Sequence, residues 1–219
     1  MEQKQRQFES RKRYVAAIII GTIAFIIVFA ASYALSYFEL QRVSNLQTGV
    51  GYDIFEDKLD YSFFGISPCN TSSFEKVSRD LAFQGRIIDD LENKMGKQDS
   101  GVLLRKKFYS LIEIEHFDFL KTFNQQCRQK HNTILFFYSN DDSEASASEE
   151  AGRILGVVHN RYEKNLTIYS FDIDLASDLV NKLEAKYNVT DSEAPVVIIN
   201  EKTMVKLPVN IGEIEKHLM

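Results

Sequence analysis

The chain has 219 residues, a formal net charge of −5 at neutral pH, two cysteines and four histidines. Basic residues gather before residue 14, so the remaining chain is more acidic still and does not favour electrostatic binding of nucleic acid. About 180 residues follow the first apolar segment, enough for one domain with a helical extension but too few for two enzymatic domains.

Residues 14–38 form an almost wholly apolar run without a charge, directly after Arg11, Lys12 and Arg13. At about 1.5 Å per residue, a helix of this length exceeds a hydrocarbon core of roughly 30 Å. The run therefore predicts one transmembrane helix. Five basic and two acidic residues precede it, so the positive-inside rule places the leader, residues 1–13, in the cytoplasm and everything after Phe38 outside the cell membrane.

A cleaved signal peptide is the alternative to an uncleaved anchor. The small residues that end the apolar run, Ala30, Ala31, Ser32 and Ala34, would suit a cleavage site. The apolar part of a signal peptide usually holds about 7 to 15 residues, however, and this run is longer. We therefore expect a signal anchor that keeps the protein attached to the membrane.

Residues 39–66 predict a helical stalk beyond the membrane. Apolar side chains recur there at a rough helical spacing, at Leu40, Val43, Leu46, Val50 and Ile54. Gly49 and Gly51 weaken a helix by about 1 kcal/mol each. A homodimeric coiled coil through the stalk is one arrangement, but a run this brief more often lies against its own domain.

Residues 67–130 predict two antiparallel helices joined by a polar turn at 96–101. The first helix begins at a capping box, Ser72 to Glu75, and the second ends near Cys127. The expected apolar face of the first helix comprises Phe74, Val77, Leu81, Ile88, Leu91 and Met95. That of the second comprises Leu104, Phe108, Leu111, Ile112, Phe119 and Phe123.

The two cysteines flank this helical hairpin. Cys69 precedes the first helix and Cys127 ends the second, so antiparallel packing brings them together at the open end. Disulfides persist outside the cytoplasm, and closing a loop of this length stabilises a fold by roughly 4 kcal/mol in the chain-entropy model. We expect a structural disulfide, with two free buried thiols or a redox-active pair as alternatives.

From residue 131 onward, the period changes to that of an α/β domain. The expected strands and helices follow one another as strand 133–138, a helix from a capping box at Ser146 and Glu149, strand 166–171, helix 175–187, strands 196–199 and 203–207, and helix 211–218. The two longer helices should bury Ile154, Leu155, Val157 and Val158, and Leu179, Val180 and Leu183. Right-handed crossovers would make the first three strands parallel and the fourth antiparallel.

Three segments give this domain a family resemblance. They are Leu166 to Asp174 (LTIYSFDID), Tyr187 to Thr190 (YNVT), and Ala194-Pro195 followed by Val196 to Ile199 (VVII). Together with the order β-α-β-α-β-β-α they resemble the thioredoxin fold, in which the proline before the third strand is cis. A flavodoxin-like half-domain is the rival, but the terminal β-hairpin and helix favour thioredoxin. The expected fold is α/β: a thioredoxin-like domain over residues 131–219, preceded by a transmembrane helix and an antiparallel helical hairpin.

The resemblance also implies where a catalytic dithiol would lie. Members of that family carry a C-x-x-C pair after the first strand, where helix N-terminal amides lower a thiol pKa. The corresponding positions here fall near Asp142 and Ala145, and neither is a cysteine. Dithiol exchange at this place is therefore excluded, and Asp141, Asp142 and Ser143 are expected to cap the next helix.

The sequence does not favour a metal, a cofactor or a hydrolytic nucleophile. The acidic residues after the first strand, Asp141, Asp142, Glu144, Glu149 and Glu150, lack the spacing of a calcium loop. The histidines, His116, His131, His159 and His217, form no ligand pair, and Ser143 has neither a nearby histidine nor a glycine elbow.

The expected role is protein binding or scaffolding instead of catalysis. The groove beside the cis-proline would take an extended segment of a protein or peptide client as an added strand, and it would be formed by Asp141, Asp142, Ser143, Ala194 and Pro195. The alternative is a thiol-disulfide oxidoreductase that uses Cys69 and Cys127 as a displaced redox pair. The sequence also contains three N-glycosylation sequons, at Asn70, Asn165 and Asn188.

Overall fold

The structure is a computed structural model of the chain, and it describes residues 2–62, 65, 67–69, 71–128, 130–141, 143–190, 193–206 and 210–218. The chain divides into two compact units, Met1–Arg42 and Val43–Met219. We describe each unit by itself.

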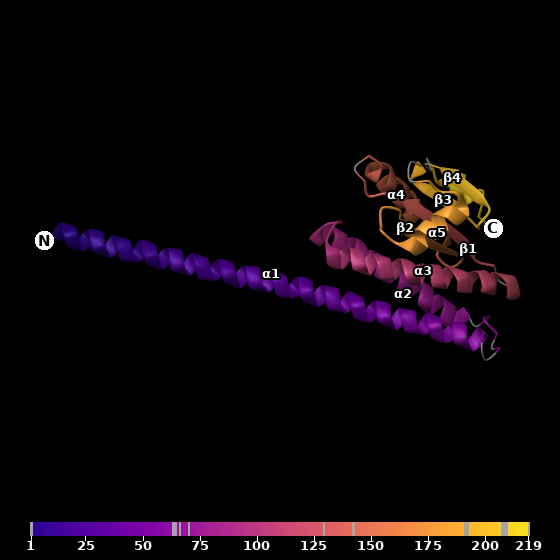
Figure 1. The fold of residues 1–219 in the computed structure, drawn as a ribbon, viewed down its shortest axis with the longest axis horizontal. Helices are drawn as coiled ribbons and strands as arrows, with labels where there is room; N and C mark the ends of the chain where they lie inside the picture. The colour runs from indigo at the N-terminus through magenta and orange to yellow at the C-terminus, as the bar shows by residue number, and fades with distance from the viewer. Residues whose placement is uncertain are drawn as a thin grey trace. The chain divides into compact units, whose positions relative to one another are not determined.

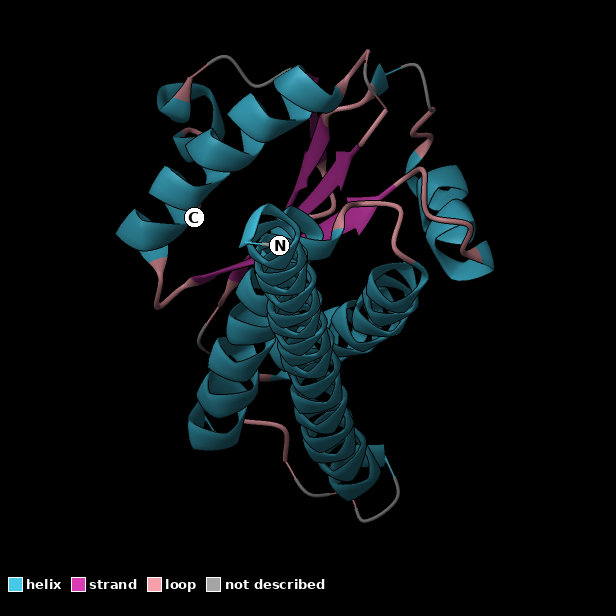
Figure 2. Ribbon diagram, turned by 90° about the vertical axis from the view of Figure 1, so that its left-hand side faces the viewer, coloured by secondary structure: helices cyan, strands magenta, loops and turns pink. Residues whose placement is uncertain are grey.

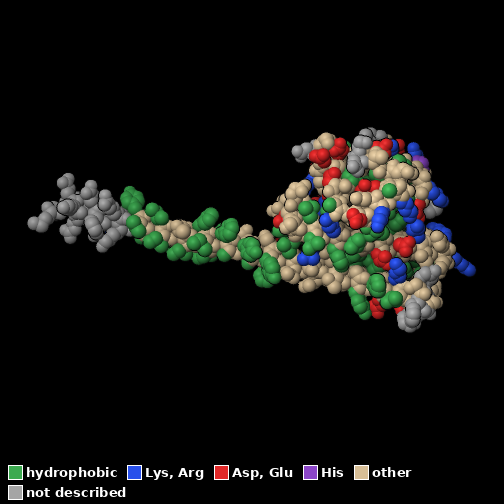
Figure 3. Space-filling model, viewed as in Figure 1, with side chains coloured by type: hydrophobic (Ala, Val, Ile, Leu, Met, Phe, Trp, Pro, Cys, Tyr) green, Lys and Arg blue, Asp and Glu red, His purple; other side chains and the backbone are tan. Residues whose placement is uncertain are grey.

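The first unit consists of the N-terminal part of helix α1, which runs from Glu2 to Ser62. Within the described residues, one helix is long and apolar enough to cross a membrane, and it lies in α1 between Arg13 and Asp60. Large apolar side chains from Tyr14 to Phe38 are exposed along it (Figure 3). The structure therefore agrees with the predicted span in length, composition and exposure.

In the second unit, the C-terminal part of α1 packs with α2 (Thr71–Met95) and α3 (Ser100–Gln126) (Figure 1). Val43, Val50 and Ile54 are buried in this packing. The Gln47 amide donates a hydrogen bond to the Arg105 carbonyl in α3 at 2.9 Å. Residues 43–62 are thus helical as predicted, and they lie against their own domain.

The predicted apolar face of α2 is confirmed at Val77, Leu81, Ile88 and Leu91, all of which are buried, whereas the side chain of Phe74 lies outside the described ones. The predicted cap is wrong. Because α2 already begins at Thr71, Ser72 lies in its first turn.

The apolar face predicted for α3 is partly wrong. Leu104, Phe108 and Leu111 are exposed, to 59 %, 40 % and 45 %, whereas Ile112 and Phe123 are buried as expected. The buried side of α3 is rotated and includes polar side chains at Lys106, Ser110, Glu113 and His116. The prediction failed because it counted only apolar residues as candidates for burial.

The remaining elements follow the predicted order. They are β1 (Asn132–Tyr138), α4 (Ala145–Tyr162), β2 (Leu166–Asp172), α5 (Asp178–Tyr187), β3 (Val196–Ile199), β4 (Thr203–Lys206) and α6 (Ile211–Glu215). The strands form one mixed sheet in the order β2-β1-β3-β4. The peptide bond between Ala194 and Pro195, just before β3, is cis, as the resemblance implies.

One strand direction differs from the prediction. β1 and β2 are parallel, but β3 is antiparallel to β1, and β4 is antiparallel to β3. Val196, the first residue of β3, pairs with Phe137 near the end of β1. Because β3 begins where β1 ends, it must run in the opposite direction. The right-handed crossover rule governs only returns to a parallel strand, so it did not apply to this connection.

Helices cover the sheet (Figure 2), and the sheet separates two hydrophobic cores. Alternate residues of β1 face α1, α2, α3 and α5 on one side, through Leu135 and Phe137. The residues that alternate with them, Ile134 and Phe136, face α4 and α6 on the other side. This alternation is the period of a strand that is buried on both faces.

Helices α4 and α5 differ from the prediction in detail. Leu155 and Val158 are buried as expected, but Val157 is exposed. The cap of α4 is Glu144 instead of Ser146, and α5 begins only at Asp178, where the Ser177 side chain caps it by accepting a hydrogen bond from the amide of Val180. The boundaries shift because local hydrogen bonds, which the apolar period does not report, decide where a helix starts.

Candidate functional site

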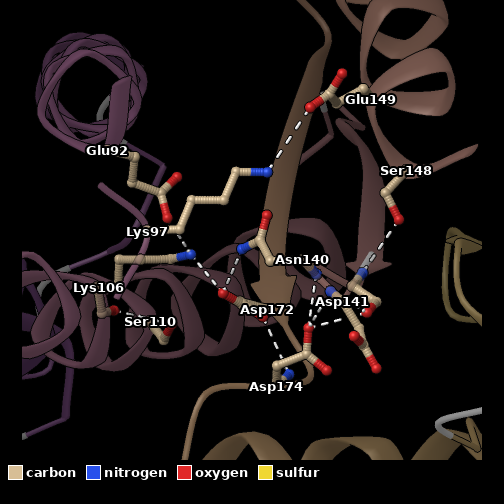
Figure 4. Close-up of polar contacts among 11 residues, drawn as sticks. Glu92, Lys97, Lys106, Ser110, Asn140, Asp141, Ser148, Glu149, Asp172 and Asp174 are labelled. Atoms are coloured by element: carbon tan, nitrogen blue, oxygen red, sulfur yellow. Dashed lines mark hydrogen bonds and ion pairs between the residues drawn. The ribbon is translucent and has the colours of Figure 1, made fainter. Parts of the chain in front are cut away.

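The loop after β1 is held by a carboxylate from the turn after β2. One oxygen of Asp174 accepts hydrogen bonds from the Ser139 hydroxyl at 2.9 Å, from the Asn140 amide N–H at 2.6 Å and from the Asp141 amide N–H at 3.1 Å (Figure 4). Three donors converge on one oxygen, so the acidic end of β2 fixes the conformation of the loop in which the resemblance would place a dithiol.

The structure describes one of the two positions near which the resemblance would place a dithiol. Asp142 lies outside the described residues, and Ala145 is the first residue of α4. Both cysteines of the chain lie in one disulfide, so no free thiol is present.

The other residues of the predicted client groove do not share one kind of environment. Asp141 and Ser143 are exposed, and the Ser143 hydroxyl donates to the carboxylate of Glu144. Ala194 and Pro195 are buried at the start of β3. Their side chains offer little surface to a client, so a client would have to rely on backbone groups at this place.

A buried lysine forms the centre of a second polar cluster, beside this loop. Lys106 of α3 is 4 % exposed. Its ammonium donates to Glu92 of α2 at 2.6 Å and to the carboxylate of Asp172 at the end of β2. The same Asp172 oxygen accepts from the side-chain amide of Asn140 at 2.7 Å. One ammonium thus joins two helices and the sheet (Figure 4).

The charges around Lys106 favour its protonated form. Burial by itself lowers the pKa of Lys106, but the neighbouring Tyr138, Asp172 and Glu92 outweigh burial and raise the pKa above its usual value. The ammonium lies 5.3 Å from the centre of the Tyr138 ring. Burial raises the pKa of Tyr138 in turn, so at neutral pH the cluster contains an ammonium and a neutral phenol.

Sequence analysis did not single out Lys106, Glu92 or Asp172. One signal was present, because Val102, Lys106, Ser110, Glu113 and Phe117 recur at steps of three and four, which places them on one face of a helix. A lysine in such a series needs buried partners of opposite charge, and a glutamate needs buried hydrogen-bond donors. Those partners lie far away in the sequence, so the pattern alone could not name them.

A cavity of about 640 Å³ lies between the α2–α3 hairpin, α4 and the ends of β1 and β2. Its wall includes Ile88 and the rings of Tyr109, Phe136 and Tyr138, together with Lys106, Glu92 and Asp172. An ion pair between Lys97 and Glu149, at 3.7 Å, joins the α2–α3 turn to α4 at the cavity (Figure 4). Ala145 and Ser139 also line it, so the cavity adjoins the position where the resemblance would place a dithiol.

Deeper in the fold, a second set of polar groups fixes α3 against β2. Glu113, 1 % exposed, accepts a hydrogen bond from the backbone N–H of Ser170 at 2.8 Å, and burial raises its pKa well above the usual range. The His116 ring pairs with the Tyr169 hydroxyl at 2.8 Å, and burial lowers the pKa of His116 to about 3. At neutral pH His116 is therefore uncharged in the folded protein, and burial favours the protonated form of Glu113.

Among the described residues, no group of three or more His, Cys, Asp or Glu side chains lies close enough to hold a metal ion. The imidazole of His131 pairs with the Thr167 hydroxyl at 2.9 Å, a hydrogen bond that joins the residue before β1 to β2. Burial lowers the pKa of His131 to about 4.

The predicted disulfide is confirmed. Cys69 and Cys127 are bonded, with 5.5 Å between their Cα atoms, and they join the segment before α2 to the end of α3. Cys127 is buried and Cys69 is exposed.

Comparison with known proteins adds no family. No protein-family model matches the sequence, and no curated protein matches it.

We expect Lys106→Met to destabilise the second unit strongly, because it leaves Glu92 and Asp172 buried without a counter-charge. Breaking one partner of a buried ion pair costs about 3 to 5 kcal/mol. Chemical denaturation of the detergent-solubilised chain measures the loss. Lys107→Met on the same helix removes an equal charge outside the cluster and should cost less than about 1 kcal/mol. Equal losses for the two variants would contradict the central role of Lys106.

We expect the folded state to lose stability as the pH falls from about 6.5 to 4. The unfolded chain takes up protons at His116 and His131 near their ordinary pKa, whereas the folded chain does not until about pH 3 and 4. Protons therefore favour unfolding, by up to about 1.4 kcal/mol per pH unit for each histidine. Denaturation midpoints across this range measure the slope, and His116→Gln should reduce it.

Glu113 supplies a test of opposite sign. Its raised pKa keeps a proton on the folded chain that the unfolded chain loses above about pH 4.5, so Glu113 costs stability as the pH rises. Glu113→Gln should therefore gain stability over the parent chain toward neutral pH. A profile unaffected by both variants would show that neither group is buried in solution as it is here.

Proposed function

We propose that the chain is a single-pass membrane protein with a thioredoxin-like domain outside the cytoplasm, and that this domain binds a partner instead of catalysing dithiol exchange. The observation that supports this proposal is the cavity beside the loop after β1, which has polar and aromatic walls and adjoins the position where the resemblance would place a dithiol. Ligand sites are typically concave, with an apolar lining and a few placed polar groups.

The topology of the sheet supports the thioredoxin-like fold over its rival. A flavodoxin-like half-domain would carry a parallel sheet. Here β3 runs antiparallel to β1, and β4 antiparallel to β3. The element order β-α-β-α-β-β-α supports the same choice. The fold alone does not decide the activity, so the binding role rests on the cavity.

The membrane orientation follows from the charges that flank the apolar run. The basic leader, residues 1–13, favours a cytoplasmic N-terminus, which would place the second unit outside the cytoplasm. The disulfide supports this orientation, because such bonds persist in oxidising compartments.

Two sequons allow this orientation to be tested. Asn165 and Asn188 are exposed, so both are open to an oligosaccharyl transferase if the domain enters the lumen of the endoplasmic reticulum. Translation with microsomes should give a glycosidase-sensitive mass increase that Asn165→Gln and Asn188→Gln each reduce. A signal-peptidase product that releases the domain from the microsomes, or no glycan on a membrane-integrated chain, would contradict an anchored luminal domain.

The oxidoreductase alternative rests on the disulfide. Cys69 is exposed and lies two residues before α2, where a helix N-terminus can stabilise a thiolate. Cys127, in contrast, is buried at the C-terminal end of α3. The bond also closes the α2–α3 hairpin, which is the position of a structural staple.

The reduction potential of the Cys69–Cys127 bond separates the two functions. We expect a value below about −300 mV, as for structural disulfides, with reduction lowering the unfolding free energy by roughly 4 kcal/mol. Thiol alkylation and mass analysis of the membrane-purified chain across a glutathione series measure the potential. A value between about −120 and −270 mV would favour the oxidoreductase instead. The double variant Cys69→Ser, Cys127→Ser supplies the control without a bond.

A further inference from the structure

The wall of the cavity carries more buried negative than positive charge. Glu92 and Asp172 have side chains that are 10 % and 5 % exposed, and both share the single ammonium of Lys106, which is 5 % exposed. Charges removed from water are costly unless they are compensated. The cluster thus lacks one positive charge, and the cavity is the open space beside it.

The two carboxylates differ in how completely they are bonded. Asp172 uses both oxygens: one accepts from Lys106 and Asn140, and the other accepts from the backbone N–H of Asp174 at 3.0 Å. Glu92 has only Lys106 as a side-chain partner among the residues that the structure describes, through one oxygen. The second oxygen of this nine-tenths-buried carboxylate is left for a donor in the cavity.

The aromatic and aliphatic side chains of the wall suit the stem of a cation. Tyr109, Phe136 and Tyr138 line the cavity, and the ammonium of Lys106 already lies near the face of the Tyr138 ring. Cations are attracted to such ring faces, and alkyl chains pack against Ile88 and the rings. The raised pKa of Lys106 shows that this environment favours positive charge in spite of burial.

Among the described residues that line the cavity, the basic side chains already have acidic partners. Lys106 is bonded to two carboxylates, Lys97 is paired with Glu149, and Arg153 contacts Glu150. An anionic ligand would have to displace one of these carboxylates before it could bind, whereas a cation adds the missing charge.

We propose that this cavity binds the terminal ammonium or guanidinium of an alkyl chain, which donates to the second oxygen of Glu92 while its stem lies against Ile88 and the aromatic rings. The inference rests on the proposed binding function and names the chemistry of the ligand. A free diamine and a basic side chain of a partner protein share this chemistry.

The experiment is calorimetric titration of the detergent-solubilised full chain. The free cations are putrescine and agmatine, and the protein-derived ones are the N-acetyl amides of lysine and arginine. The neutral and anionic counterparts of putrescine are 1,4-butanediol and succinate. We expect the tightest-binding cation to bind at least about tenfold more tightly than either counterpart, since a charge-assisted hydrogen bond contributes that much. Tighter binding of putrescine and agmatine would identify a free cation as the ligand, and tighter binding of the two amino-acid amides would identify a basic side chain of a partner protein.

Two variants locate the binding at the cavity. Glu92→Gln should weaken the cation at least about tenfold, whereas Asp90→Asn, an exposed acid on the same helix, should leave its affinity unchanged. If Glu92→Gln fails to fold, Gly152→Met tests separately whether the cation binds in the cavity. A Cβ added at Gly152 makes only an ordinary contact with the Phe136 ring, at 3.8 Å, so α4 can carry a methionine there; because Gly152 lines the cavity, the longer side chain should occupy part of it and abolish binding.

The outcomes are distinct. Equal affinity for butanediol or succinate, no binding by any cation, or cation binding that survives both Glu92→Gln and Gly152→Met would overturn the inference. If a neutral or anionic ligand binds and Gly152→Met abolishes its binding, the preference for a cation would be wrong, but the proposed binding function would still hold. A redox-active disulfide would instead overturn the proposed function without altering the titration.

Discussion

The buried ammonium of Lys106 is the interaction on which the second unit depends most. It pairs with Glu92 of α2 and Asp172 at the end of β2, so one side chain of α3 holds a helix and a sheet in place at once. Non-directional hydrophobic contacts allow helices to slide and rotate, but a buried charge requires its partners at fixed positions. The rotation of α3 follows from this requirement. It turns Lys106, Glu113 and His116 inward and leaves Leu104 and Phe108 exposed.

The acidic end of β2 extends the same constraint to the loop after β1. Asp172 accepts hydrogen bonds from the side chains of Lys106 and Asn140, and Asp174 accepts three hydrogen bonds from the loop. Hydrogen bonds thus hold the loop where the resemblance would place a reactive dithiol. A loop held in this way suits a site whose walls must keep one shape, and the cavity lies directly beside it. A loop held in one conformation before a ligand arrives suits the binding site that we propose here.

Polar side chains on the buried side of α3 fix its position, but their burial costs free energy. Glu113 and His116 are buried, and each is hydrogen-bonded to β2; burial favours the neutral form of both side chains. Neutral buried groups avoid the penalty of a buried charge, but they make the folding stability depend on pH. The buried acid lowers the stability as the pH rises, and the buried base lowers it as the pH falls. The disulfide between Cys69 and Cys127 fixes the far end of the same helix covalently. Helix α3 is therefore anchored by an ion pair near its start, by hydrogen bonds in its middle and by a disulfide at its end.

The sequence by itself determined the apolar run in α1, the order of strands and helices, the meeting of Cys69 with Cys127, and the absence of a dithiol after β1. These depend on period, length and residue identity, which are local properties of a chain. Only the tertiary structure decided the direction of β3, the rotation of α3 and the partners of Lys106. Each depends on contacts between distant segments, as between Lys106 and Asp172, and a charged residue in a helical pattern does not state which distant charge it will meet.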